Sequence, residues 1–329
     1  MNKVIKISTS IQLIVITGLS LLSLNSFAGQ KIDQTMDVDS QSYIEIEHIN
    51  GKAAVKGWDK NTILVQGELS ERAEEFIFRR DGKNVLNEVK MKASNRDYNS
   101  WGNWDNDEGD DLTIYVPKTS SVFYTSVNAN FNGNDLLGGL GADVVNGAIN
   151  VNNVTGKIRL ESVNGDIKAD KVEGNVRIET VNGAIQGHHS GQGEIGFDSV
   201  NGNIRLHSDS REIDVETVNG DIELNLDQVS ELDLSSVNGS IEVNMTLIEN
   251  GDVEISTVGG RVELTLQQEV SARFDIEGHA GGRFINKLTD DKMQKAKYGP
   301  RRWLEFSTGN GSANVEISTV HGRIELGRR

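Results

Sequence analysis

Residues 158–183 of this chain read IRLESVNGDIKADKVEGNVRIETVNG. Apolar and charged residues alternate on both sides of each Asn-Gly pair, which is the period of a β-strand. The triplet Val-Asn-Gly ends at Gly165 and again at Gly183, and Gly156 and Gly174 each fall nine residues earlier. The stretch therefore predicts a repeating turn of 18 residues, in which two strands are joined by a corner at each end.

The same triplet recurs through the middle of the chain. From the first copy to Gly260, successive corner glycines lie 18, 18, 19, 18, 19 and 21 residues apart. A unit this short cannot bury its apolar side chains alone, so neighbouring copies must stack on one another. In such a stack the corner asparagines come about 4.8 Å apart and can form a ladder of amide contacts. The predicted corner ladder consists of Asn146, Gly147, Asn164, Gly165, Asn182, Gly183, Asn201, Gly202, Asn219, Gly220, Asn238 and Gly239.

Two other arrangements of these strands are less compatible with the pattern. Asn-Gly between apolar runs also favours β-hairpins, but an antiparallel meander would need about seventeen strands, and open sheets rarely exceed ~10. A triangular coil needs a six-residue subperiod, whereas the subperiod here is nine residues. We therefore predict an all-β fold, a flattened two-sheet parallel β-solenoid with turns of 18–19 residues.

The repeat divides the chain into three predicted parts. Residues 1–28 form a signal peptide, residues 29–120 an irregular N-terminal β region that caps the solenoid, and residues 121–329 the solenoid repeats with a C-terminal cap. In the signal peptide, Lys3 and Lys6 precede an apolar run of 14 residues, and Ala28 precedes the cleavage point. The run is shorter than the ~20 residues of a membrane span. We expect export to the periplasm, the cell surface or the medium, with no transmembrane segment in the mature chain.

The composition limits the partners of the chain. It holds 33 Lys+Arg against 49 Asp+Glu, a net charge of −16, which becomes −18 once Lys3 and Lys6 leave with the signal peptide. Such a polyanion is repelled by nucleic acid and by anionic lipid surfaces. The expected partner is an envelope or extracellular ligand, either a glycan or a protein. The chain has no cysteine, which excludes disulfides, thiolate metal sites and cysteine nucleophiles.

An acidic segment at residues 93–111 has the most unusual local composition. Its carboxylates could chelate calcium, the only cofactor that the sequence leaves open; they are Asp105, Asp107, Asp110 and Asp111. Trp101 and Trp104 could stack on a sugar ring. A solvated acidic loop, with its tryptophans packed on a sheet edge, explains the same residues without a ligand.

Other candidate sites are weaker. Residues 138–143 fit one copy of a calcium-binding repeat that needs tandem copies, and the solenoid register already accounts for them. The pair His188-His189 lies on a polar insert near Glu194, but two histidines on a loop seldom hold a metal without a third ligand. Carboxylates are spread evenly over the outward strand positions, which we interpret as a solvated face. The sequence thus offers no catalytic residues.

Polar inserts after Gly183 gather at the second edge of the turns. They cover residues 187–194, 207–212, 225–231 and 244–252. Insertions confined to one edge of a repeat protein usually mark the variable side, and sometimes the binding side.

Several landmarks together resemble the bacterial β-strand-repeat family catalogued as putative adhesins, a domain of unknown function. They are Ile49-Asn50-Gly51, residues 55–59, Val116-Pro117, the serial Ser/Thr-Val-Asn-Gly-x-Ile motifs and residues 318–324. The resemblance implies a β-solenoid at the cell envelope and carries no catalytic motif. We therefore expect a non-enzymatic binding or scaffold protein. The alternatives are a glycan-active β-helix enzyme, either a lyase or a hydrolase, and an accessory protein of envelope stress.

Overall fold

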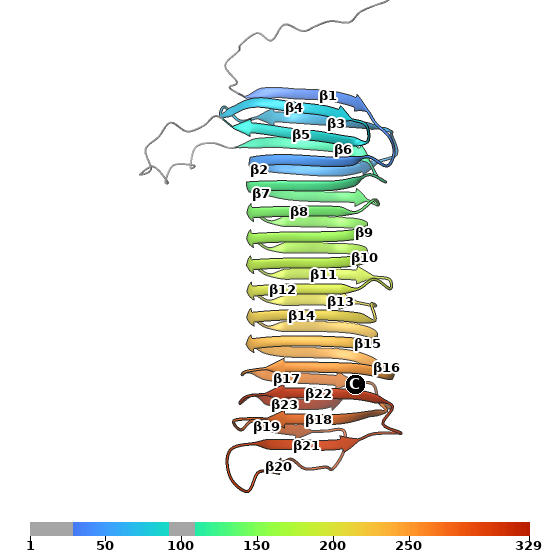
Figure 1. Ribbon diagram of the computed structural model, residues 1–329, viewed down its shortest axis with the longest axis vertical. Helices are drawn as coiled ribbons and strands as arrows, with labels where there is room; N and C mark the ends of the chain where they lie inside the picture. The colour runs from blue at the N-terminus through green and yellow to red at the C-terminus, as the bar shows by residue number, and fades with distance from the viewer. Residues whose placement is uncertain (1–28, 92–108) are drawn as a thin grey trace, which may run out of the picture.

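The computed structural model describes residues 29–91 and 109–329, and these residues form β-strands and turns with no helix. The strands stack along one axis, with the N-terminal strands at one end and β18–β21 at the other (Figure 1). Accordingly, no helix in the described ranges is long and apolar enough to cross a membrane. The prediction of an all-β fold is confirmed.

The N-terminal strands are β1 (Gln30–Asp37), β2 (Tyr43–Trp58), β3 (Thr62–Leu69), β4 (Ala73–Asp81), β5 (Asn84–Met91) and β6 (Asp110–Pro117). The central strands are β7 (Ser121–Leu136), β8 (Leu140–Asn146), β9 (Ile149–Asn164), β10 (Ile167–Asn182), β11 (Ile185–Ser190), β12 (Ile195–Asn201), β13 (Ile204–Ser208), β14 (Glu212–Asn219), β15 (Ile222–Asn238), β16 (Ser240–Thr257) and β17 (Arg261–Leu266). The last strands are β18 (Ala272–Gly278), β19 (Arg283–Asn286), β20 (Gln294–Lys295), β21 (Arg302–Ser307), β22 (Ala313–Thr319) and β23 (Arg323–Arg328).

The central strands pair in parallel with the strands one turn away. Ile149 of β9 lies opposite Ile167 of β10, and Asn182 of β10 lies opposite Asn201 of β12, so the offset equals the sequence repeat. Hydrogen bonding links all the described strands into one sheet, because long strands such as β9 and β10 continue past the second edge without a break. The stacking of parallel turns therefore agrees with the prediction. The strand pairing does not divide these turns into two separate sheets.

The core follows the strand alternation. Side chains such as Ile158, Leu160 and Ile178 are buried, and the same positions in neighbouring turns lie directly against them. All of these residues belong to one continuous apolar cluster along the stack. Burial of one such side chain contributes about 1.5–3 kcal/mol, so stability accumulates from turn to turn.

The Val-Asn-Gly corners are held by side-chain amides and by close backbone packing. Each corner asparagine from Asn146 to Asn238 donates through Nδ2 to Oδ1 of the asparagine in the preceding turn, over 2.8–3.1 Å. A Cβ placed on Gly183 would lie 2.1 Å from the carbonyl oxygen of Gly165. The corner therefore needs glycine because the turns approach each other closely, and not only because of backbone dihedral angles.

The two ends depart from the simple stack. At the N-terminal end, β2 already pairs in parallel with β7, with His48 opposite Ser126 and Asn50 opposite Asn128. At the other end, β22 pairs with β16 and β18 pairs with β22, so the last strands of the chain lie between β16 and β18. Strand β21 then pairs antiparallel to β18. The break in sequence period after Gly260 thus reflects a turn that is stacked out of chain order.

Candidate functional site: a groove along the corner

A groove of about 850 Å³ runs along the axis beside the Val-Asn-Gly corners. Three positions of each turn line it, the fourth, third and second residues before the corner glycine, except that the first turn, whose corner is Ala129, contributes only Thr125 and Ser126. The lining spans nine turns, from Thr125 to Val320, and adds His279 at the far end. At one strand spacing per turn, its length is about 38 Å.

The second position before the glycine forms a valine row. Its members are Val127, Val145, Val163, Val181, Val200, Val218, Val237 and Val258. Each is between 38% and 43% exposed, and together they make up most of the large exposed apolar side chains in the described residues. One such valine would be unremarkable, but a continuous exposed apolar row is typical of a binding surface.

The fourth position forms a carboxylate row over five consecutive turns. Its members are Asp143, Glu161, Glu179, Asp198 and Glu216. In the next turns the position is held by Ser235, Ser256 and Ser318. Like charges one strand spacing apart destabilise a sheet, so this row needs cations near it.

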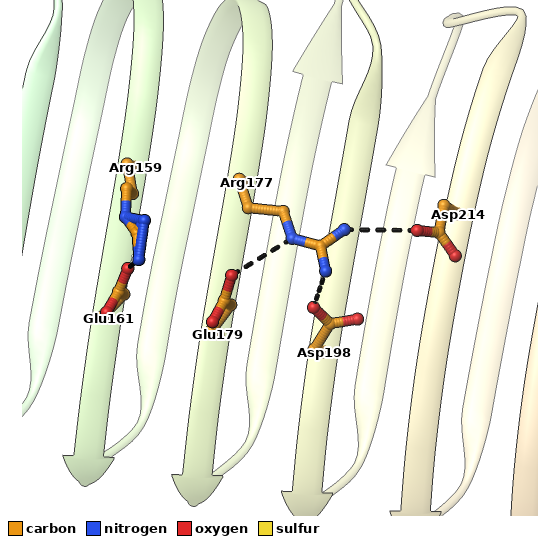
Figure 2. Close-up of polar contacts among 6 residues, drawn as sticks. All are labelled: Arg159, Glu161, Arg177, Glu179, Asp198 and Asp214. Atoms are coloured by element: carbon orange, nitrogen blue, oxygen red, sulfur yellow. Dashed lines mark hydrogen bonds and ion pairs between the residues drawn. The ribbon is translucent and has the colours of Figure 1, made fainter.

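Two arginines from a neighbouring outward position partly neutralise the carboxylate row (Figure 2). Arg159 contacts Glu161. Arg177 contacts Asp198, donates from Nε to Glu179 over 3.2 Å, and donates from Nη1 to Asp214 over 3.2 Å. The guanidinium can cross to the next turns because Gly196 lies in its path, and a Cβ there would be 2.3 Å from Nη1.

The environment of the row opposes full ionisation. Burial, reinforced by Asp214, Glu179 and Glu216, raises the pKa of Asp198 to about 6 despite the opposing charge of Arg177. Burial also raises the pKa of Asp143. Within the described residues, Oδ1 of Asp143 and Oδ1 of Asp198 are buried without a hydrogen-bond partner. Two carboxylate oxygens buried beside the groove therefore lack a donor.

The third position forms the floor of the groove, with Val144 in one turn and small hydroxyl side chains in the other lining turns. Ser162 and Thr180 donate to corner carbonyl oxygens of the preceding turn, over 3.3 and 3.4 Å. Thr217 and Ser236 are 4% and 5% exposed, and their hydroxyl oxygens have no hydrogen-bond partner in the part of the chain that the structure describes. The floor thus adds two unpartnered polar groups to those of the carboxylate row.

The row of floor residues begins at His48, which occupies this position in the first turn. Its Nε2 lies 3.1 Å from Oδ2 of Asp110, and its Nδ1 lies 3.1 Å from the Tyr124 hydroxyl. Oδ1 of Asp110 accepts from the Ser70 amide over 2.7 Å, and burial raises the pKa of Tyr124. This buried network ties β2, β6 and β7 together.

The predicted calcium and sugar candidates fall in different places. Asp110 belongs to the buried network in β6, and Asp111 pairs with Lys52 over 2.9 Å at the surface. The other candidates lie outside the described residues; they are Asp105, Asp107, Trp101 and Trp104. No group of three or more His, Cys, Asp or Glu residues suited to a metal occurs in residues 29–91 and 109–329.

The histidine pair separates between interior and surface. His189 is buried, with Nδ1 3.1 Å from the Ser208 hydroxyl and Nε2 2.9 Å from the carbonyl oxygen of Gly174. His188 points outward, with Nδ1 3.6 Å from Asp170 and its ring beside that of His207. The two histidines therefore do not face a common ligand.

Sequence reasoning missed the groove, although its signal lies in the repeated triplet. The valine of Val-Asn-Gly has the parity of an outward position, where a polar residue is expected. The outward carboxylates were interpreted as a solvated face, and only the turn-by-turn register places five of them beside the valine row.

The fold and the groove together define a class, an all-β repeat protein of stacked turns with a lengthwise groove. The chain belongs to the Toastrack DUF4097 family, whose sequence pattern matches residues 34–327. This confirms the family that the sequence motifs predicted. No curated protein matches the chain.

Several solved structures are similar over most of their length. A "putative cell adhesion protein" from Clostridium sporogenes is 9% identical, with 91% of this chain and 100% of that chain covered and a TM-score of 0.23. A "putative lipid binding protein" from Parabacteroides distasonis is 12% identical, with 91% and 98% covered and a TM-score of 0.28. A "putative adhesin" from Bacteroides fragilis is 12% identical, with 91% and 98% covered and a TM-score of 0.30. Likenesses this low say nothing of the ligand of this chain.

Proposed function

We propose that this protein is an exported, non-enzymatic binding scaffold of the bacterial cell envelope, which holds an elongated ligand lengthwise in the axial groove. One observation carries the proposal. The same three positions of nine turns combine an exposed valine row with polar oxygens that have no partner in the described residues. Exposed apolar surface costs free energy in the unbound protein, and a ligand that covers the valine row would remove that cost.

The shape of the groove supports binding over the enzymatic alternative. Glycoside hydrolysis needs two carboxyl groups that differ in environment and flank one bond. Here the carboxylates repeat at one per turn, and Arg177 contacts two of them, Glu179 and Asp198. A surface that repeats along the axis suits a ligand that also extends along it.

The proposal is tested with glycan and peptide arrays probed by the mature chain. The variant Val181→Asp/Val200→Asp places charge in the valine row. The variant Asn150→Asp/Gln186→Asp places the same charge on the strands that follow the corner glycines, outside the groove, as a control; we call this face the opposite wall. We expect array ligands that bind the wild type and the control but not the groove variant. Equal binding by all three proteins, or no binding to either array, would contradict a groove-binding role.

Two further measurements address export and catalysis. Mass spectrometry of the protein from periplasmic and culture fractions should find a mature N-terminus at Gly29. Products of bound glycans are sought in the same samples. Cleavage that is lost in Glu179→Gln/Asp198→Asn would replace the scaffold by a glycan-active enzyme.

A further inference from the structure

We infer that the ligand of the groove is a basic amphipathic helix of a partner polypeptide, with its apolar stripe on the valine row and its Lys and Arg residues on the carboxylate row. The inference rests on the proposed function and names the chemical class of its ligand. Three observations carry it: the charge of the wall, the pairing of the strand backbones, and the spacing of the turns.

The wall beside the valine row calls for cations. Between Gly141 and Ser235, the outward positions four and six residues before the corner glycines hold seven carboxylates and two guanidinium groups, a net charge of −5. The carboxylates are Asp143, Glu161, Glu179, Asp198, Asp214, Glu216 and Asp233. Arg177 shows how a guanidinium fits the wall, since it reaches carboxylates of three consecutive turns (Figure 2). Ligand cations would extend this arrangement to carboxylates of the row such as Glu216, which is exposed.

The strand backbones disfavour an extended peptide. A peptide that adds as a β-strand needs free backbone N–H and C=O groups at a sheet edge. In the carboxylate-row turns those groups already pair with the turns above and below. A helix satisfies its own backbone groups and needs only side-chain contacts.

The spacing of the rows also favours a helix. Neighbouring valines are separated by one strand spacing, about 4.8 Å, and a helix presents one apolar residue per turn of about 5.4 Å. Over four intervals the two patterns drift apart by about 2.4 Å. Same-face side chains of an extended chain lie about 6.8 Å apart and would drift by about 8 Å.

Other ligand classes match the lining less well. An anionic lipid headgroup or a nucleic acid would meet the carboxylates, which repel it. Glycans commonly stack on aromatic rings, whereas the described lining consists of Val, Ser, Thr, Asp and Glu side chains with one histidine. The aliphatic valine row and the carboxylate wall of the groove together match a ligand that carries an apolar stripe with cations beside it.

The length and polarity of the helix follow from the rows. A groove of about 38 Å accommodates a helix of about 25 residues. The fourth-position carboxylates end at Glu216, and serines take their place at positions 235, 256 and 318, whereas the outward position two residues earlier stays acidic through Asp233, Glu254 and Glu316. The basic residues of the helix should therefore be most frequent over about 19 Å of its length and less frequent over the remainder.

The test uses labelled 25-residue peptides and the mature protein in fluorescence anisotropy. The first peptide carries a leucine stripe with flanking lysines in one half, the second has the same composition in scrambled order, and the third has glutamates for lysines. We expect the first peptide to bind at least tenfold more tightly than either of the others. Equal binding of the scrambled peptide would reduce the effect to non-specific attraction and overturn the inference.

Matched protein variants locate the binding. Glu161→Gln/Glu179→Gln/Glu216→Gln removes three charges from the carboxylate row, and the control removes three from consecutive turns of the opposite wall; the control residues are Glu223, Glu242 and Glu263. We expect at least tenfold weaker binding in the first variant and less than a twofold change in the second. Equal weakening in both would overturn the inference. Val181→Asp/Val200→Asp provides a second groove variant, and thermal unfolding confirms that each variant is folded.

The inference and the proposed function fail separately. If no peptide binds but an array glycan binds in a groove-dependent manner, the helix is wrong and the scaffold role stands. If the groove variants leave the binding of every ligand unchanged, both are wrong.

Discussion

The Val-Asn-Gly corner and the opposite edge of the same turns are built differently. At the corner the register stays constant from Asn146 to Asn238, and the asparagine lies opposite an asparagine in every turn. At the opposite edge the pairing shifts register between β10 and β11 and again between β15 and β16. A pocket of about 400 Å³ does lie there, lined by polar and charged residues; they are Gln192, Asp209, Arg211, Asp227, Gln228 and Thr246.

This difference explains where a lengthwise surface can form. A groove parallel to the axis needs every turn to place the same kind of side chain at the same position. The corner meets that condition, and the edge with inserts does not. In repeat proteins, inserts sometimes mark the binding side. Here the groove along the constant edge is larger and more continuous than the pocket at the edge with inserts.

The largest contrast should come from two buried histidines, one at each edge. His48→Ser introduces at the first corner the residue type that later turns have at this position. The substitution leaves the buried carboxylate of Asp110 without its histidine partner. We expect a loss of about 3–5 kcal/mol in the free energy of unfolding. His189→Ser at the opposite edge removes hydrogen bonds to Ser208 and Gly174 but leaves no buried carboxylate without a partner. The loss in the free energy of unfolding should therefore be smaller for this variant. Urea denaturation of both variants measures the difference, and equal losses would refute the role given to Asp110.

A second contrast concerns the close approach of the turns. Gly183→Ala drives a methyl group toward the Gly165 carbonyl oxygen, which the strand pairing holds in place. We expect a loss of about 3 kcal/mol in the free energy of unfolding. At the opposite edge, a Cβ on Gly251 meets first the flexible end of Leu247, at 2.7 Å, so Gly251→Ala should cost less. A Gly183→Ala variant as stable as the wild type would show that the corner tolerates a wider separation of turns.

A third contrast compares amides. Asn182 bonds to the asparagines of both neighbouring turns, and Asn182→Ala should cost about 1 kcal/mol because both bonds are exposed to solvent. Asn244, on the opposite wall, bonds to Asn225 alone among the described residues, over 3.3 Å, and Asn244→Ala should cost less than about 0.5 kcal/mol. Thermal unfolding resolves the pair. A reversed order would mean that the corner ladder follows from the fold and does not stabilise it.

Much of the fold could be predicted from the sequence because each turn repeats the same alternation of apolar and polar residues and the same corner motif. The alternation around Gly165 and Gly183 specifies strands, and the 18-residue step specifies the register. The place of β22 between β16 and β18 could not be predicted, because it depends on which late segment best matches the surface of β16. The groove was missed for a related reason, since Glu179 and Asp198 look like ordinary surface charges until the register brings them side by side.

The last contrast concerns the pH dependence of stability, and it distinguishes the carboxylate row from the serines that continue it. Asp198 has a folded-state pKa of about 6, against an ordinary value of 3.8, so the folded protein holds this proton more tightly than the unfolded chain does. The stability that this provides is present below about pH 4 and is lost as the pH rises through 6. Asp198→Asn should therefore gain stability relative to the wild type between pH 4 and pH 7, by about 1 kcal/mol after solvent screening.

Ser235→Ala, two turns further along the same row, removes no titrating group, so its stability should follow the pH curve of the wild type. Urea unfolding at the two pH values measures all three proteins. If the Asp198→Asn curve also runs parallel to that of the wild type, the carboxylate row is better solvated than its buried oxygens indicate, and its demand for a cationic ligand is correspondingly weaker.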